Sequence, residues 1–193
     1  MRFAFATIVL LVFPSAAPGR PALSTISADQ DSQRVGSFRV QSDPTLRGAV
    51  RAFGRPTSCR LTSPISSVAT WNAHGLRISF ATFGGIPPGR TACTYRAIRI
   101  SWIRASGRRG WRTGVGLRPA DSALDVKRRY PRARYDARAR QLWPTPAYWL
   151  VHYRERCVIG ECPAPYHRVP KLIAVMRHGY VQSFFLPVGA QGD

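Results

Sequence analysis

Two short segments of the chain share one pattern of apolar and polar positions. In residues 43–54, "DPTLRGAVRAFG", apolar side chains recur at i, i+3, i+4 and i+7, which is the spacing of one helix face. These positions are Leu46, Ala49, Val50 and Phe53. Asp43 is a good N-cap, Pro44 suits the first helical position, and Gly54 with Pro56 two residues later is typical of a helix end. The segment therefore predicts a short helix.

Residues 121–131 repeat this pattern. Ser122 and Asp125 resemble a capping box, in which each side chain accepts a hydrogen bond from the backbone N–H of the other residue. The apolar positions on one face are Ala123, Val126 and Tyr130, and Pro131 ends the segment. Both segments also carry Asp-x-x-Leu, at Asp43/Leu46 and at Asp121/Leu124. The sequence therefore predicts the same helix twice.

Four short segments with the period of a half-buried strand follow each predicted helix. After the first helix they are residues 58–62, 66–71, 76–83 and 97–103, and after the second they are residues 133–137, 148–155, 171–177 and 180–186. His74-Gly75 and His178-Gly179 lie between apolar runs, where glycine can supply a positive φ for a tight turn. We therefore predict an α+β fold of two tandem repeats, residues 38–112 and 113–193. Each repeat is a short helical segment packed on a four-stranded antiparallel sheet.

This order resembles the β-lactamase-inhibitor-protein fold, which is built from tandem units of helical hairpin and four antiparallel strands. It is also similar to the small domains of outer-membrane assembly lipoproteins. "GLRPADSALDVKRRYP", residues 116–131, resembles the family's opening helix motif, which is capped by Asp or Ser and ends at Tyr-Pro. The resemblance implies an exported actinobacterial-type protein. The inhibitor's target-contacting residues have no counterpart here, so inhibition is not implied.

The N-terminus has the pattern of a secretory signal. Arg2 precedes an apolar run from Phe3 to Phe13, which is shorter than the about 20 residues that span a bilayer, and small residues follow it. We predict a signal peptide over residues 1–22, with a buried N-terminal strand as the alternative. Residues 23–37 are polar without periodicity and predict a flexible leader. The processed protein is expected to be secreted or held in the cell envelope, and not to span a membrane.

Export also determines how the four cysteines are interpreted. An even number of cysteines in an oxidising compartment predicts two disulfides, with three possible connectivities. We favour Cys59–Cys93 and Cys157–Cys162, because this pairing closes a loop within each half of the chain.

The net charge is strongly positive. Lys and Arg number 29 against 9 Asp and Glu, which gives +20, and the only lysines are Lys127 and Lys171. Such a charge attracts polyanions and repels other copies of the chain. The arginines are scattered, however, and a GC-rich coding sequence is an equally good explanation of their number.

No catalytic constellation is apparent. His74 and His178 precede glycines in predicted turns, and a thiol catalyst would need His167 beside Cys157 or Cys162. The same segment, "CVIGECPAPYH", could ligate zinc only with a fourth ligand such as His152 or Glu161, and its spacing is wider than usual for structural zinc. "FGGIPPG", residues 83–89, lacks the features of a phosphate-binding loop. We therefore predict no enzyme, no cofactor and no small-molecule substrate.

Mixed aromatic and basic residues in the predicted strands remain as a candidate binding surface. They are Trp102, Arg104, Trp149, His152 and Arg154. Such mixtures stack on rings and hold phosphates, whereas the simpler interpretation is that the aromatics fill the core. The sequence thus predicts an exported, non-catalytic protein that binds an unknown protein. The alternative is a basic protein that binds an anionic envelope component: wall polymer, phospholipid or extracellular nucleic acid.

Overall fold

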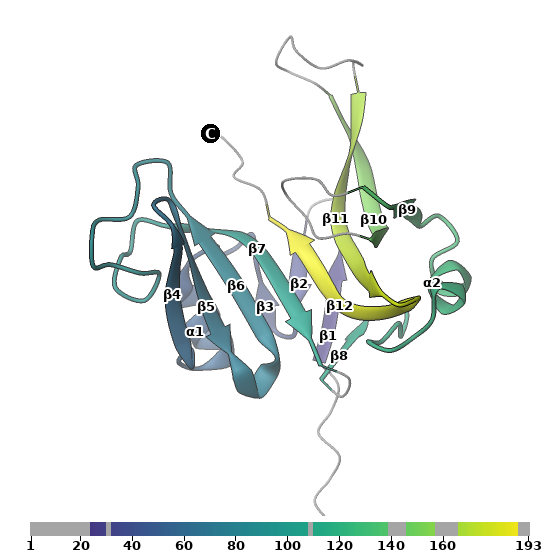
Figure 1. Ribbon diagram of the computed structural model, residues 1–193, viewed down its shortest axis with the longest axis horizontal. Coiled ribbons are helices and arrows are strands. Elements are labelled where there is room, and N and C mark those ends of the chain that lie inside the picture. The colour runs from purple at the N-terminus through teal and green to yellow at the C-terminus, as the bar shows by residue number, and fades with distance from the viewer. Residues whose placement is uncertain (1–23, 30–31, 108–109, 139–145, 157–165, 189–193) are drawn as a thin grey trace, which may run out of the picture.

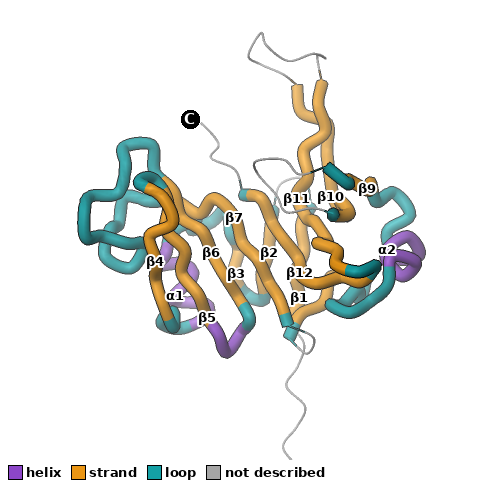
Figure 2. The backbone as a smooth tube through the Cα atoms, in the orientation of Figure 1, coloured by secondary structure: helices purple, strands orange, loops and turns teal. Residues whose placement is uncertain are grey.

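The computed structural model describes residues 24–29, 32–107, 110–138, 146–156 and 166–188, without the side chains of residues 154–156, 166 and 167. Within these residues the protein is an α+β structure dominated by strands, with two α-helices and two sheets (Figures 1 and 2). No helix in the described ranges is long and apolar enough to cross a membrane.

The larger sheet contains all eight of the predicted strands. In sheet order they are β4 (Ser58–Ser63), β5 (Ser66–Trp71), β6 (Leu76–Ala81), β7 (Arg99–Ser106), β12 (Tyr180–Pro187), β11 (Tyr166–Arg177), β10 (Ala147–Arg156) and β9 (Arg134–Asp136). Every neighbouring pair is antiparallel. Because β7 pairs with β12, the eight strands form one continuous sheet (Figure 1).

Both predicted His-Gly turns are confirmed. The short 3₁₀ helix Asn72–His74 ends at Gly75, whose φ of 58° is left-handed. A Cβ at this glycine would collide with the carbonyl oxygen of Ser106, so the turn needs glycine for space as well as for conformation. His178 and Gly179 both have positive φ, 49° and 81°, and connect β11 to β12.

A second, smaller sheet contradicts the predicted flexible leader. Its strands, in sheet order, are β3 (Phe38–Arg39), β2 (Gln33–Val35), β1 (Ser24–Ala28) and β8 (Trp111–Thr113), and only β1 and β8 are parallel among its pairs. The prediction for residues 23–37 is therefore wrong over the described parts, 24–29 and 32–37. Ile26 lies directly opposite Val35 and both are fully buried. Two apolar residues in short strands are too few to produce a visible period in the sequence.

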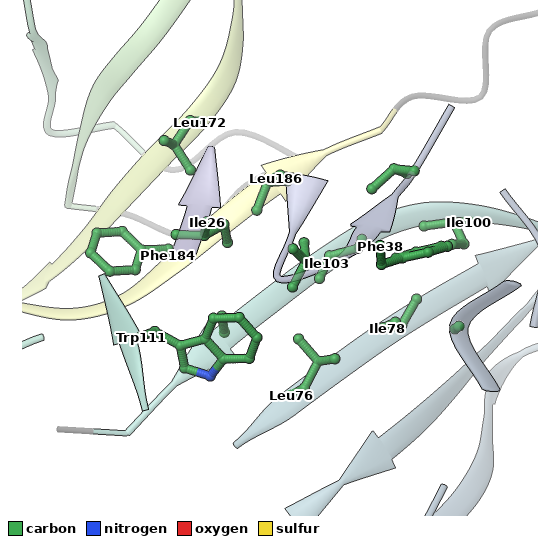
Figure 3. Packing of buried hydrophobic residues seen from close by; sticks show 14 of the residues in the cluster. Ile26, Phe38, Leu76, Ile78, Ile100, Ile103, Trp111, Leu172, Phe184 and Leu186 are labelled. Carbon is green, nitrogen blue, oxygen red and sulfur yellow. The ribbon is translucent and has the colours of Figure 1, made fainter. Parts of the chain in front are cut away.

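The core lies between the two sheets. The smaller sheet and α1 lie behind the larger sheet in Figure 1. In Figure 3, Ile26 and Phe38 of the smaller sheet approach Ile78, Ile103 and Phe184 of the larger sheet, and all five belong to one buried cluster. Side chains distant in sequence therefore share a single core.

The first helix, α1 (Leu46–Phe53), begins later than predicted. Its N-cap is Thr45, whose hydroxyl accepts a hydrogen bond from the Gly48 N–H at 3.3 Å, and not Asp43. The Asp43 carboxylate accepts a bond from the Thr45 hydroxyl at 2.5 Å and pairs with Arg51, while the carbonyl of Pro44 accepts from the N–H of Ile100. The carbonyl of Pro44 thus ties the helix start to β7, whereas Asp43 bonds to residues of α1 and its N-cap.

The second helix, α2 (Ala123–Arg129), has the predicted capping box. The Asp125 N–H donates to the Ser122 hydroxyl at 3.2 Å, and the Ser122 N–H donates to the Asp125 carboxylate at 3.0 Å. Val126 is fully buried. The other core-facing residues predicted on the two helices, Val50, Phe53 and Tyr130, are half-buried and pack against the same core.

The predicted disulfide between Cys59 and Cys93 is present, and it joins β4 to the connection between β6 and β7. Its two Cα atoms lie 6.1 Å apart. Cys157 and Cys162 lie outside the described residues, as does the predicted signal peptide, residues 1–22.

Candidate binding face

One face of the larger sheet is turned away from the core, and we call it the outer face. Its side chains alternate with those that enter the core, so Arg77 lies between the buried Leu76 and Ile78. One row of directly paired residues crosses all eight strands on this face. The row is Ser58, Thr70, Arg77, Arg104, Phe185, Ile173, Trp149 and Arg134.

Four of the five residues predicted as a binding surface lie on the outer face. Trp102 and Arg104 come from β7, and Trp149 and His152 come from β10. The rings of Trp149 and His152 are 6.5 Å apart, centroid to centroid. The side chain of Arg154 lies outside the described part of the chain. The candidate residues chosen from the sequence that the structure describes therefore lie on the same face of the sheet.

The two tryptophans of this face have different surroundings. Trp149 is only 1 % exposed and belongs to a second apolar cluster, with Ala147, Ile173, Val175 and Phe185. Trp102 packs on the border of that cluster and stays half-buried. Its ring stacks on Phe185, with centroids 5.5 Å apart and planes inclined by 30°. Trp149 thus stabilises the sheet, whereas Trp102 has surface left for a ligand.

Arginines dominate the part of the face beside Trp102. Arg77 and Arg104 are directly opposite each other on β6 and β7. Arg104 donates from Nε to the Ser183 hydroxyl at 2.9 Å and from Nη2 to the Gln182 amide oxygen at 3.2 Å. Burial lowers the pKa of the Arg104 guanidinium, and the charge of Arg77 lowers it further. The charge of Arg77 therefore disfavours the charged form of Arg104 in this arrangement.

Their charges are not neutralised within the described residues. The ion pairs found there, Arg51–Asp43, Arg128–Asp125 and Arg129–Asp121, all involve a helix or the residues just before it. Two further exposed arginines lie on the outer face as well. Arg60 of β4 belongs to the row of directly paired residues that runs through Val68 and Ser79 to Trp102, and Arg99 of β7 alternates with the core-facing Ile98 and Ile100. This region is basic and open to anions.

The far end of the face, around His152, contributes less charge than its composition indicates. Burial lowers the pKa of His152, and the nearby charges of Arg168 and Arg134 act in the same direction, while a hydrogen bond from the imidazole to the Trp149 backbone carbonyl partly opposes them. His152 is therefore neutral at pH 7. The guanidinium of Arg134 lies over the Trp149 ring, 4.9 Å from its centroid, which is cation–π geometry.

The remaining sequence candidates lie either in exposed turns or outside the described residues. His74 and His178 are exposed in turns. The side chains of Cys157, Glu161, Cys162 and His167 lie outside the described residues. Within the described ranges no three His, Cys, Asp or Glu residues could hold a metal ion together.

Arg77 and Phe185 belong to this face but were not selected from the sequence. The alternation Leu76-Arg77-Ile78 places Arg77 opposite the core, which the sequence does indicate. Its position beside Arg104 depends on the pairing of β6 with β7, and the position of Phe185 depends on the pairing of β12 with β7. Strand pairing is not encoded in the local pattern.

Comparisons of this chain with protein-family models, with curated proteins and with solved structures found no match.

Proposed function

We propose that the protein is an exported, non-catalytic binding protein that engages its partner through the outer face of the larger sheet. The observation that carries the proposal is the gathering of Trp102 and Arg104 with Arg77 on the face of the larger sheet opposite the main core, beside the smaller apolar cluster around Trp149. A half-buried aromatic ring and unneutralised guanidinium groups are the side chains enriched where proteins bind partners.

Two repeats, resembling the β-lactamase-inhibitor-protein fold, are part of this proposal. Asp43 pairs with Arg51 and Asp121 pairs with Arg129, so the same ion pair spans eight residues at each helix. The N–H groups of Ile100 in β7 and Val181 in β12 donate to the carbonyls of Pro44 and Asp121, each at 2.8 Å. The strand order β4-β5-β6-β7-β12-β11-β10-β9 is the order expected of two similar halves related by an approximate two-fold axis. These correspondences support a duplicated unit.

Export is supported by two independent features. The N-terminal cation, apolar run and small residues have the pattern of a signal peptide. The Cys59–Cys93 disulfide suits an oxidising compartment.

The partner is either a protein or an anionic envelope component. The first follows from the fold resemblance, and the arginines of the outer face favour the second. Salt separates the two, because contacts between exposed charges weaken as ionic strength rises. A protein partner bound through packed apolar contacts would be retained at high salt, whereas a polyanion would be released.

The test is capture of envelope material by the oxidised full chain, at about 0.1 M and about 0.5 M salt. We expect Trp102→Ala and Arg104→Gln to reduce captured material roughly tenfold. Arg47→Gln is the matched control, because Arg47 is exposed on α1, behind the larger sheet, and its loss changes the net charge equally. Equal capture by all three variants and the unmodified chain would remove the outer face as the binding surface.

A further inference from the structure

Arg77 and Arg104 form a like-charge pair across two neighbouring strands. Like charges directly opposite each other in a sheet destabilise it, and the described residues place no carboxylate against either guanidinium. An anion bound between the two groups would relieve this repulsion. Guanidinium groups hold phosphate oxygens through paired, charge-assisted hydrogen bonds, so a phosphate fits the requirement well.

The guanidinium of Arg104 is already held in position. Its bonds to Ser183 and Gln182 on β12 fix the group against the sheet before any ligand arrives. Fixing a side chain in advance lowers the entropy lost on binding. Arg77, in contrast, is exposed and can adjust to the ligand.

Trp102 provides a second kind of contact beside the arginines. It lies two positions before Arg104 on β7, on the same face, and its ring stacks on that of Phe185. Directly opposite Trp102 on β6 is Ser79, whose small buried side chain leaves the ring uncrowded from that strand. A supported, half-exposed indole is a platform on which another flat ring can stack.

A phosphate site next to a stacking platform matches one class of polymer in particular. We infer that Arg77, Arg104 and Trp102 form a binding site for single-stranded nucleic acid, in which the guanidinium pair holds a backbone phosphate and the indole stacks on a base. Polyphosphate and wall polymers without bases can occupy only the arginine part. The flat face of an antiparallel sheet suits splayed bases better than a duplex. Arg60 and Arg99 lie on the same face and extend its positive charge.

This inference rests on the proposed function, because it names the ligand class of the same face. The test measures fluorescence anisotropy of a labelled thymidine oligonucleotide titrated with the oxidised full chain at several salt concentrations. We expect Arg77→Gln combined with Arg104→Gln to reduce the slope of log K against log salt by about 0.7 for each phosphate that the variant no longer neutralises. Trp102→Leu should weaken binding roughly tenfold and leave that slope unchanged.

Two controls keep the result interpretable. Arg34→Gln with Arg47→Gln removes two exposed arginines from other parts of the protein, and we expect affinity close to that of the unmodified chain. Trp102→Phe keeps an aromatic ring and should retain most of the affinity that Trp102→Leu loses. If Trp102→Leu does not fold, as judged by circular dichroism, Trp102→Met replaces it as the variant without a ring, and it should weaken binding while Trp102→Phe retains most of the affinity.

Other results would overturn the inference. Polyphosphate of equal charge binding as tightly as the oligonucleotide, with Trp102→Leu neutral for both, would show general attraction of polyanions. Equal effects of the two double-arginine variants would show that net charge alone decides. Either outcome leaves the proposed function standing if the capture experiment still depends on Trp102 and Arg104, and failure of that experiment is the separate result that removes the proposed function.

Discussion

Phe53 joins the first helix to both sheets through its ring. The ring centroid lies 5.9 Å from that of Phe38, 6.2 Å from that of Trp71 and 5.8 Å from that of His74. Truncating a buried phenylalanine removes apolar packing and leaves a cavity, at a cost of about 3–5 kcal/mol. Because Phe53 is half-buried, we expect Phe53→Ala to lower the free energy of unfolding by about 3 kcal/mol, measured by urea denaturation.

Leu124 on the second helix is the matched control. It occupies the position of the shared Asp-x-x-Leu pattern, yet it is 74 % exposed. Leu124→Ala should therefore change the free energy of unfolding by no more than about 0.5 kcal/mol. If Phe53→Ala lowered the free energy of unfolding as little as Leu124→Ala, α1 would not pack through Phe53.

Exposure of single side chains is the part of the site that the sequence predicts least well. Trp102 and Trp149 each lie in a predicted strand, and both were chosen as candidate binding residues. Trp149 is buried by Ile173 and Phe185, which come from strands β11 and β12. Only the pairing of strands distant in the sequence distinguishes the stabilising tryptophan from the accessible one.

At the scale of elements, local signals predict much of the structure. Both helices and all eight strands of the larger sheet follow from capping residues, the helical period and the strand period, which are properties of a few neighbouring residues. The smaller sheet was missed because β2, β3 and β8 are only two or three residues long. Their stability comes from pairing and from the core that they cover, not from their own pattern.

The capping box of α2 makes stability depend on pH. Hydrogen bonds from the Ser122 side chain and backbone lower the pKa of Asp125, and Arg128 and Arg129 lower it further, whereas burial raises it. A carboxylate whose pKa is depressed on folding stabilises the protein above its unfolded pKa of about 3.9, and this contribution is lost as the pH falls through the folded pKa. Asp125→Asn should therefore lower stability at pH 6.

The measurement is urea denaturation of both proteins from pH 6 downward. We expect the difference between the unmodified chain and Asp125→Asn to shrink below about pH 4 and to vanish below the folded pKa of Asp125. Salt should also reduce the difference at pH 6, because Arg128 and Arg129 lie near a carboxylate that is partly open to solvent. A difference that stays constant with pH would mean that the charge of Asp125 contributes nothing to the cap.

The whole molecule is joined in ways that no local pattern indicates. The buried side chain of Gln33 donates from Nε2 to the carbonyls of Lys171 and Pro187, each at 2.9 Å, and so ties the smaller sheet to the larger one. Strand β1 pairs with β8, which follows it by more than eighty positions. A chain whose sequence predicts a flexible leader and two tandem repeats is therefore cross-connected in the folded state, leader included.

Because of these connections, we expect the chain to unfold as one cooperative unit. Strand β12 lies between β7 and β11, so loss of either half of the larger sheet would leave a long unpaired edge and expose the shared core. With the disulfide intact, far-UV circular dichroism and tryptophan fluorescence should report the same urea midpoint. Trp71, Trp102 and Trp111 belong to the first half of the sequence, and Trp143 and Trp149 belong to the second. Replacing all tryptophans of one half with phenylalanine therefore leaves the fluorescence of the other half to be followed alone. Different urea midpoints in these variants would show that the two repeats fold independently. The pairing of β7 with β12 would then contribute less stability than the strand pairing within each half.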